Sequence, residues 1–97
     1  MANNFKIGEV GETVITRGLV AALEKSEQLK EDLSNAWAQY VNCEWGILGE
    51  DDKQMNDSAV QNKDDRILAR YKTTEGDIYI ITEWDRSYTT FMFCDEY

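Results

Sequence analysis

The spacing of apolar residues changes along the chain and divides it into a helical part and a β-rich part. Between residues 27 and 42, apolar side chains recur every three or four positions, as they do on one face of an α-helix. From residue 66 onward they recur at every second position, which is typical of strands with one buried face. The pattern therefore predicts helices first and a sheet afterwards.

The helix expected over residues 27–42 has the most regular apolar face. That face consists of Leu29, Leu33, Ala36, Trp37, Tyr40 and Val41. Ser26 stands just before the helix and is a residue type that caps helix N-termini. Gly46 and Gly49 follow the helix and end or redirect it. We expect the apolar face to pack on the sheet, against Ile78 or Ile80.

Two shorter helices are predicted on either side of this one. The first begins after Thr16, a suitable N-cap, and ends near residues 24–26; its apolar residues are Leu19, Val20 and Leu23. The other begins at Glu50 with acidic residues in its first turn, where they favour the positive end of the helix dipole. Residues 61–65 are polar and are expected to form a loop.

Three strands are expected over residues 66–72, 78–84 and 88–93, separated by turns at 74–77 and 85–87. Such short turns predict an antiparallel meander. The segment Phe5–Val10 also alternates apolar and polar residues, and we expect it to add a fourth strand at an edge.

The chain is therefore predicted to be a single α+β domain over residues 1–97, with the order β-α-α-α-β-β-β. Two or three N-terminal helices should pack on one face of a three- to four-stranded antiparallel sheet. A chain of 97 residues fits one domain of ordinary size.

The charge of the chain limits its partners. Ten Lys and Arg oppose nineteen Asp and Glu, which gives a net charge of −9. This argues against direct binding to nucleic acid or to an anionic membrane, since both attract basic side chains. No apolar run is long enough to span a membrane, and no signal peptide is visible, so a cytoplasmic location is expected.

Histidine and cysteine limit the chemistry in turn. The chain has no His, which removes the Ser-His-Asp triad, the usual zinc sites with His ligands and the commonest general base. Cys43 and Cys94 lie far apart, and we expect both to be reduced and partly buried. No catalytic residue, metal ligand or cofactor is predicted.

Two clusters of charged residues have more than one interpretation. Residues 83–86, Glu-Trp-Asp-Arg, flank a turn rather than a cleft, and we expect Arg86 to pair with Asp85 or Glu83. The cations at 66, 70 and 72 share one strand face and are expected to form salt bridges, rather than an anion site.

The candidate partner-binding residues are Glu50, Asp51, Asp52, Asp57 and Trp45. The four acids lack the ligand spacing and the glycine of a calcium loop. Trp45 stands beside a glycine bend, and we expect it to be an exposed apolar anchor next to these acids.

The C-terminal half shows a resemblance. The segments 66–73 and 80–87, with Gly76, Thr89, Thr90 and the pair Glu96-Tyr97, resemble a family of small, mostly uncharacterised plasmid- and phage-borne proteins. Glu44-Trp45-Gly46, Glu50-Asp51 and Asn56-Asp57 upstream are similar to that family too. The resemblance implies an accessory protein of a mobile genetic element and brings no catalytic residues with it.

Three functions are compatible with the sequence. The first is a non-enzymatic inhibitor of a nucleic-acid enzyme, such as an anti-CRISPR or anti-restriction protein, which presents acidic side chains to a basic groove. The second is a regulatory or accessory binding module in which the acidity serves only solubility. The third, a small carboxylate-dependent hydrolase, lacks a nucleophile motif, a phosphate loop and metal-ligand spacing.

Overall fold

The computed structural model describes residues 7–97 and has the predicted α+β architecture. Its elements are β1 (Glu12–Ile15), α1 (Arg17–Lys25), α2 (Glu27–Val41), α3 (Glu50–Asn62), β2 (Ile67–Tyr71), β3 (Ile78–Thr82), β4 (Tyr88–Phe93) and the short 3₁₀ helix η1 (Cys94–Glu96). The order β-α-α-α-β-β-β is confirmed. Among the described residues, no helix has the length and apolar character needed to cross a membrane.

The four strands form one sheet in the order β1-β4-β3-β2. β2, β3 and β4 make the predicted antiparallel meander, and β1 pairs with β4 in parallel, so the sheet is mixed. β1 occupies an edge, as expected of a fourth strand, but it starts at Glu12. The prediction of a strand over residues 5–10 is wrong for residues 7–10, and Phe5 and Lys6 lie outside the described residues.

The physical reason for the displaced strand is that the alternation in this segment ends at two glycines. Gly8 and Gly11 both have positive φ, at 81° and 68°, which breaks the extended backbone. Ile7 is nonetheless buried, and its amide donates to the carbonyl of Val41 at 3.2 Å. The segment before β1 thus runs along the end of α2 rather than beside the sheet.

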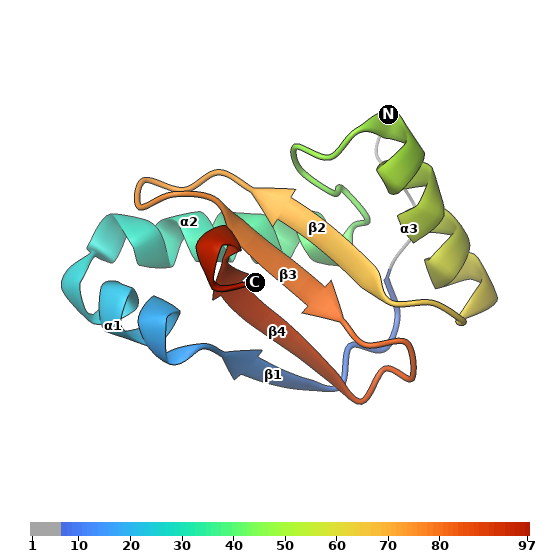
Figure 1. The fold of residues 1–97 in the computed structure, drawn as a ribbon, viewed down its shortest axis with the longest axis horizontal. Coiled ribbons are helices and arrows are strands. Elements are labelled where there is room, and N and C mark those ends of the chain that lie inside the picture. The colour runs from blue at the N-terminus through green and yellow to red at the C-terminus, as the bar shows by residue number, and fades with distance from the viewer. Residues whose placement is uncertain (1–6) are drawn as a thin grey trace.

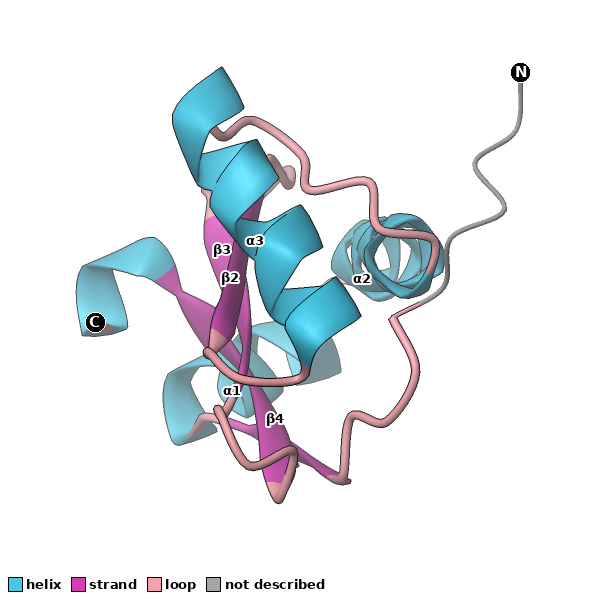
Figure 2. Ribbon diagram, turned by 90° about the vertical axis from the view of Figure 1, so that its right-hand side faces the viewer, coloured by secondary structure: helices cyan, strands magenta, loops and turns pink. Residues whose placement is uncertain are grey.

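Helix α2 covers one face of the sheet, and α1 packs against α2 and β4 (Figures 1 and 2). The predicted caps are confirmed, since the side chains of Thr16 and Ser26 accept the amides of Leu19 and Leu29. The predicted packing of α2 on the sheet is also confirmed by one core cluster that includes or contacts Leu33, Trp37, Tyr40, Val41, Ile78 and Ile80.

Helix α3 lies across the β2 edge of the sheet instead of on the face that α2 covers (Figure 2). The amide side chain of Asn56 on α3 bonds the backbone of Leu68 twice, through its Nδ2 at 2.8 Å and its Oδ1 at 3.3 Å. α3 runs to Asn62, two residues into the segment 61–65 that was expected to be a loop, and ends on Lys63 in the left-handed conformation (φ 56°).

A buried chain of hydroxyl groups ties α2 to β3, β4 and the N-terminal segment. Thr89 donates to the carbonyl of Val10 at 2.6 Å, so it must accept from Thr82, which lies at 2.7 Å. Thr82 then accepts from the hydroxyl of Tyr40 at 2.6 Å. Burial raises the pKa of Tyr40, so this hydroxyl stays protonated and able to donate.

This order of donors predicts unequal effects of two substitutions. Thr89→Val should lower the free energy of unfolding by about 2–4 kcal/mol, because the Thr82 hydroxyl and the Val10 carbonyl both lose a buried partner. Tyr40→Phe removes only the first donor and should cost about 1 kcal/mol. Urea denaturation of both variants checks this, and a larger loss for Tyr40→Phe would contradict the account of these bonds.

The turn between β2 and β3 is held to α2 by Asp32. Its Oδ2 accepts the amide of Thr74 at 2.9 Å and the hydroxyl of Thr74 at 3.0 Å. The Thr74 amide, and then the side chain of Gln28, lower the pKa of Asp32 below its ordinary value of 3.8. The contribution of Asp32 to stability is therefore present above that value and is lost as the pH falls through the lowered pKa.

We accordingly expect Asp32→Ala to lower the melting temperature at neutral pH and to have little effect once the wild-type carboxylate is protonated in acid. Thermal melts from pH 7 down to about pH 2 measure this difference. Glu31→Ala, at an exposed position on the same helix, is the matched control. A gap between wild type and Asp32→Ala that stays constant over this range would contradict the assignment.

Candidate interaction surfaces

The predicted anchor, Trp45, is a core residue. Only 3% of its surface is exposed, and its ring packs edge-to-face on Tyr40 with centroids 5.5 Å apart. Its Nε1 donates to the carboxylate of Asp57 at 2.9 Å. The expectation of an exposed Trp45 is therefore wrong, because the Gly46 bend turns this indole inward beneath α3.

The same hydrogen bond removes Asp57 from the free acidic surface. Asp57 is half-buried, whereas Glu50, Asp51 and Asp52 are exposed in the first turn of α3. The structure therefore separates the predicted set into three surface acids and one buried Trp–Asp pair. The partner-binding role of the three surface acids stays a prediction.

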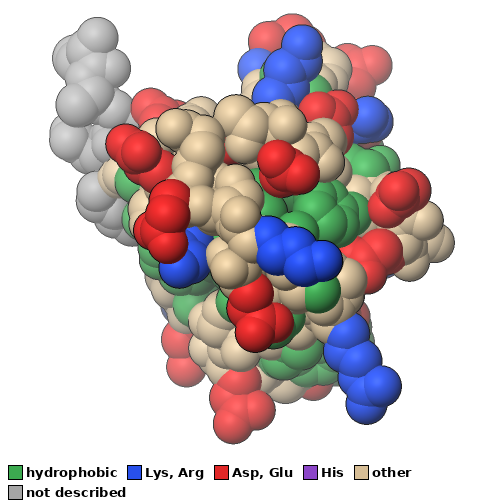
Figure 3. Space-filling model, turned by 90° about the vertical axis from the view of Figure 1, so that its left-hand side faces the viewer, with side chains coloured by type: hydrophobic (Ala, Val, Ile, Leu, Met, Phe, Trp, Pro, Cys, Tyr) green, Lys and Arg blue, Asp and Glu red, His purple; other side chains and the backbone are tan. Residues whose placement is uncertain are grey.

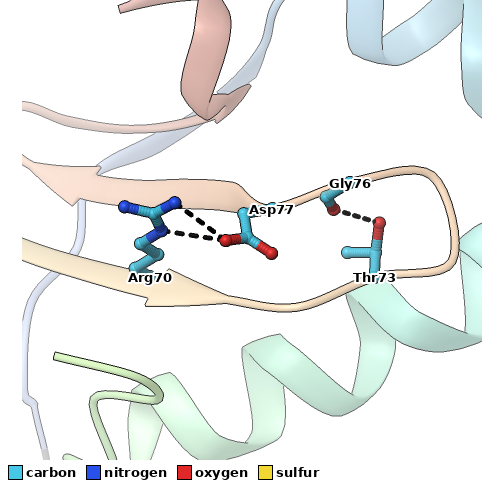
Figure 4. A network of polar contacts seen from close by, with 4 residues as sticks. All are labelled: Arg70, Thr73, Gly76 and Asp77. Atoms are coloured by element: carbon cyan, nitrogen blue, oxygen red, sulfur yellow. Dashed lines mark hydrogen bonds and ion pairs between the residues drawn. The ribbon is translucent and has the colours of Figure 1, made fainter.

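Of the three cations predicted to form salt bridges, Arg66, Arg70 and Lys72, only Arg70 does so in the described residues. Arg70 does form the expected ion pair, since its Nε and Nη2 both donate to Oδ2 of Asp77, at 3.1 and 2.8 Å (Figure 4). This bond raises the pKa of Arg70. Arg66 instead donates to the hydroxyl of Tyr97 at 2.7 Å, and within residues 7–97 Lys72 has no ion pair. The salt-bridge prediction is thus right for Arg70 alone.

Arg86 also departs from its prediction. Instead of pairing with Asp85 or Glu83 through their carboxylates, its guanidinium donates to backbone carbonyl oxygens. These belong to Ala59 (2.8 Å), Asp65 (2.7 Å), Glu83 (3.2 Å) and Trp84 (2.9 Å). Arg86 has a positive φ of 63°, which directs its side chain back under the turn toward the end of α3. This residue therefore holds the β3–β4 turn to α3.

The thiols have the predicted character. Cys43 is buried and Cys94 is half-buried, and both are present as thiols. Burial raises the pKa of Cys94, which keeps it in the less reactive protonated form. Within residues 7–97, no group of three His, Cys, Asp or Glu side chains is arranged to hold a metal ion.

The sheet face opposite α2 is a surface that the sequence analysis did not predict. Thr82 and Phe91 contact α2 side chains, so the alternate positions on each strand point the other way. Strand register then places Val14, Thr90, Ile81 and Leu68 in one row across that face, beside Met92 and Tyr79. We call this surface the open face. No α-helix covers it, but η1 lies in front of part of it in Figure 1, and Ile81 at its centre is only 4% exposed.

The open face combines apolar and aromatic side chains with two cations, since the guanidinium groups of Arg66 and Arg70 lie 5.8 Å from the ring centroids of Tyr97 and Tyr79, respectively. Tyr88 and Val14 on this face are each 42% exposed. Tyr97 is 63% exposed and lies edge-on to Tyr79, with ring centroids 5.4 Å apart. Single exposed apolar side chains are ordinary, but a contiguous group of them is typical of an interaction surface.

Acidic side chains elsewhere are mixed with other types. Figure 3 views the molecule from the end that carries α1 and the β2–β3 turn, where Asp and Glu are interspersed with Lys, Arg and hydrophobic side chains. On that side of the molecule the net charge of −9 is therefore not gathered into a continuous acidic stripe.

The sequence contained a signal for the open face. Tyr79, Ile81 and Met92 fall on the positions that alternate with the core-facing residues, so these strands are apolar on both faces.

Comparison of this chain with known protein families, curated proteins and solved structures finds no match.

Proposed function

We propose that this chain is a non-enzymatic, cytoplasmic interaction protein that binds a partner protein through the open face. The observation that supports this proposal is the exposure of Val14, Tyr88 and Tyr97 on a sheet face that no α-helix covers. Aromatic side chains provide large contact areas at protein interfaces, and Tyr is among the residue types that contribute most binding energy.

The negative charge of the chain favours a positively charged partner. A protein with a net charge of −9 associates fastest with a partner of opposite sign. On the proposed interface, apolar and aromatic contacts hold the complex, while the net negative charge of the chain speeds the encounter. The partner is accordingly a basic protein with an apolar surface patch.

A capture experiment with matched variants tests this function. The wild type is immobilised and a bacterial lysate is passed over it, beside the double variant Val14→Thr/Tyr88→Thr and the control Ile47→Gln. Threonine suits a strand, so the double variant should fold. Ile47 is an exposed apolar residue (47%) that lines a pocket with α2 and Tyr71, on the side of the sheet opposite the open face.

The proposal predicts that the captured protein binds the control as tightly as the wild type and binds the double variant at least about thirtyfold more weakly, as expected when about 2 kcal/mol of contact energy is lost. Equal binding by the double variant would refute the role of the open face.

A narrower proposal makes the partner a nucleic-acid enzyme of a defence system, as in an anti-CRISPR or anti-restriction protein of a mobile element. It is supported by the three exposed acids Glu50, Asp51 and Asp52, which can follow a groove built for phosphates. Replacing them by Gln, Asn and Asn should slow association with the captured partner and flatten its salt dependence. Unchanged association rates would assign the acidity of α3 to solubility, which is the alternative of an accessory module without mimicry.

A further inference from the structure

The outer edge of β1 has unused backbone hydrogen-bonding groups. The amide of Glu12 donates to Ser87 at 3.2 Å, and the amide of Thr16 donates to Phe91 at 3.1 Å. Because inward and outward groups alternate along a strand, the amides and carbonyls of Thr13 and Ile15 point away from β4. Within residues 7–97 these four groups have no hydrogen-bond partner.

The opposite edge of the sheet is closed, which makes the β1 edge distinctive. On β2, the Asn56 side chain hydrogen-bonds both the amide and the carbonyl of Leu68. Arg70 accepts the amide of Ile47 at 2.9 Å and donates to the carbonyl of Trp45 at 3.4 Å. Sheet edges are usually protected in this manner. In the described part of the chain, β1 has no such cover and is the lower edge of the sheet in Figure 1.

Apolar surface borders the β1 edge on both faces of the sheet. On the side of α2, a groove of about 420 Å³ is lined mainly by Thr13, Ile15, Leu23, Leu33, Trp37 and Phe91. On the open face, Val14 is 42% exposed beside the same edge, and Ile15 is 38% exposed toward the groove. A strand added to β1 would therefore cover apolar side chains with both of its faces.

We propose that the β1 edge binds an extended segment of a partner protein as a fifth strand of the sheet. The segment would exchange hydrogen bonds with Thr13 and Ile15, and its alternate apolar side chains would enter the groove and cover Val14. This goes beyond the proposed function, since it concerns the backbone edge of β1. Val14 borders both surfaces, but the tests below change Thr13 and Ser34 and leave Val14 and Tyr88 in place, so either proposal can fail alone.

The net negative charge of this chain favours a partner segment with flanking Lys or Arg at the β1 edge, rather than a second copy of this chain. Each copy carries −9, so two copies paired edge to edge would repel one another, whereas a basic segment would be attracted. Glu12 at the start of β1 adds a local negative charge at the edge itself. Lys30 also lines the groove, and its charge is paired with the carboxylate of Glu27 at 3.0 Å.

The experiment selects binders from a displayed library of random peptides of about ten residues, a length that spans one strand, using the intact chain as bait. The discriminating variant is Thr13→Pro, which deletes an outward amide without breaking a bond inside the sheet, as proline does on natural edge strands. The matched control is Thr13→Ala, which keeps that amide.

Ser34→Tyr, on the exposed surface of α2 beside the groove, is a second variant that narrows the groove and leaves the strand unchanged.

The proposal predicts selected peptides with alternating apolar residues and flanking Lys or Arg. Their affinity should fall about tenfold or more for Thr13→Pro and Ser34→Tyr, and little for Thr13→Ala. Bound peptide should also slow amide hydrogen exchange at Thr13 and Ile15. The proposal is overturned if no peptide is enriched, if the peptides bind Thr13→Pro as well as wild type, or if the wild type forms dimers that Thr13→Pro abolishes, since the edge would then belong to a second copy. Should Thr13→Pro fail to fold, full binding by Ser34→Tyr overturns it equally.

Discussion

Replacing Trp45 by Ala is expected to lower the free energy of unfolding by about 3–5 kcal/mol, the usual cost of removing a large aromatic side chain from a core. The indole is 3% exposed, packs on Tyr40 and donates to Asp57. Since small domains are stable by only about 5–15 kcal/mol, the variant should be near the limit of folding. Urea denaturation monitored by circular dichroism measures the loss.

Trp45→Phe separates packing from hydrogen bonding. Phe keeps an aromatic ring against Tyr40 but leaves the carboxylate of Asp57 without the Nε1 donor, which should cost about 1–3 kcal/mol. If Trp45→Ala leaves stability unchanged and instead weakens partner binding, the residue is a surface anchor and the core assignment is wrong.

Gly46→Ala is the second substitution with a large expected effect. A Cβ atom at this position would overlap the carbonyl oxygen of Arg70 and lie 2.8 Å from the ring of Tyr71, and the backbone has a φ of +76°. The left-handed conformation alone costs a non-glycine residue about 1–2 kcal/mol. Separating Gly46 from β2 also breaks the bonds between Arg70 and the residues on either side of Gly46, at about 0.5–1.5 kcal/mol each, so we expect a total loss of about 2–5 kcal/mol.

Gly8→Ala is the control for this effect. Gly8 also has a positive φ, of +81°, but no described atom lies within 4 Å of the position that a Cβ would take. It should therefore show only the conformational cost of about 1–2 kcal/mol. Equal losses for both variants would mean that the contact between Gly46 and β2 contributes nothing.

The helices and the meander could be predicted because their signals are local. The apolar face of α2 and its Ser26 cap lie within one short segment, and Gly76 marks the turn between two regular strands. The first strand was predicted at residues 5–10 instead of Glu12–Ile15, because its pairing with β4 joins residues more than seventy positions apart. All four residues of β1 are exposed, so burial leaves no alternating pattern in this strand.

The surfaces were harder to predict because they depend on which side chains the tertiary structure buries. An aromatic residue beside glycines is compatible with an exposed anchor or a core residue. Trp45 is a core residue because the tertiary structure brings Asp57 on α3 within hydrogen-bond distance of its indole. The carbonyl partners of Arg86 come from three separate segments, so no sequence spacing indicates them. The open face follows from knowing that α3 lies at the sheet edge rather than over it.

Photo-crosslinking tests whether the open face binds a partner protein. A benzophenone amino acid is placed at Tyr88 on the open face or at Ile47 on the α2 side of the sheet, both exposed positions, and the chain is irradiated with the captured partner. We expect a covalent complex from position 88 and none from position 47. Crosslinking from position 47 alone, or equally from both positions, would contradict the proposal.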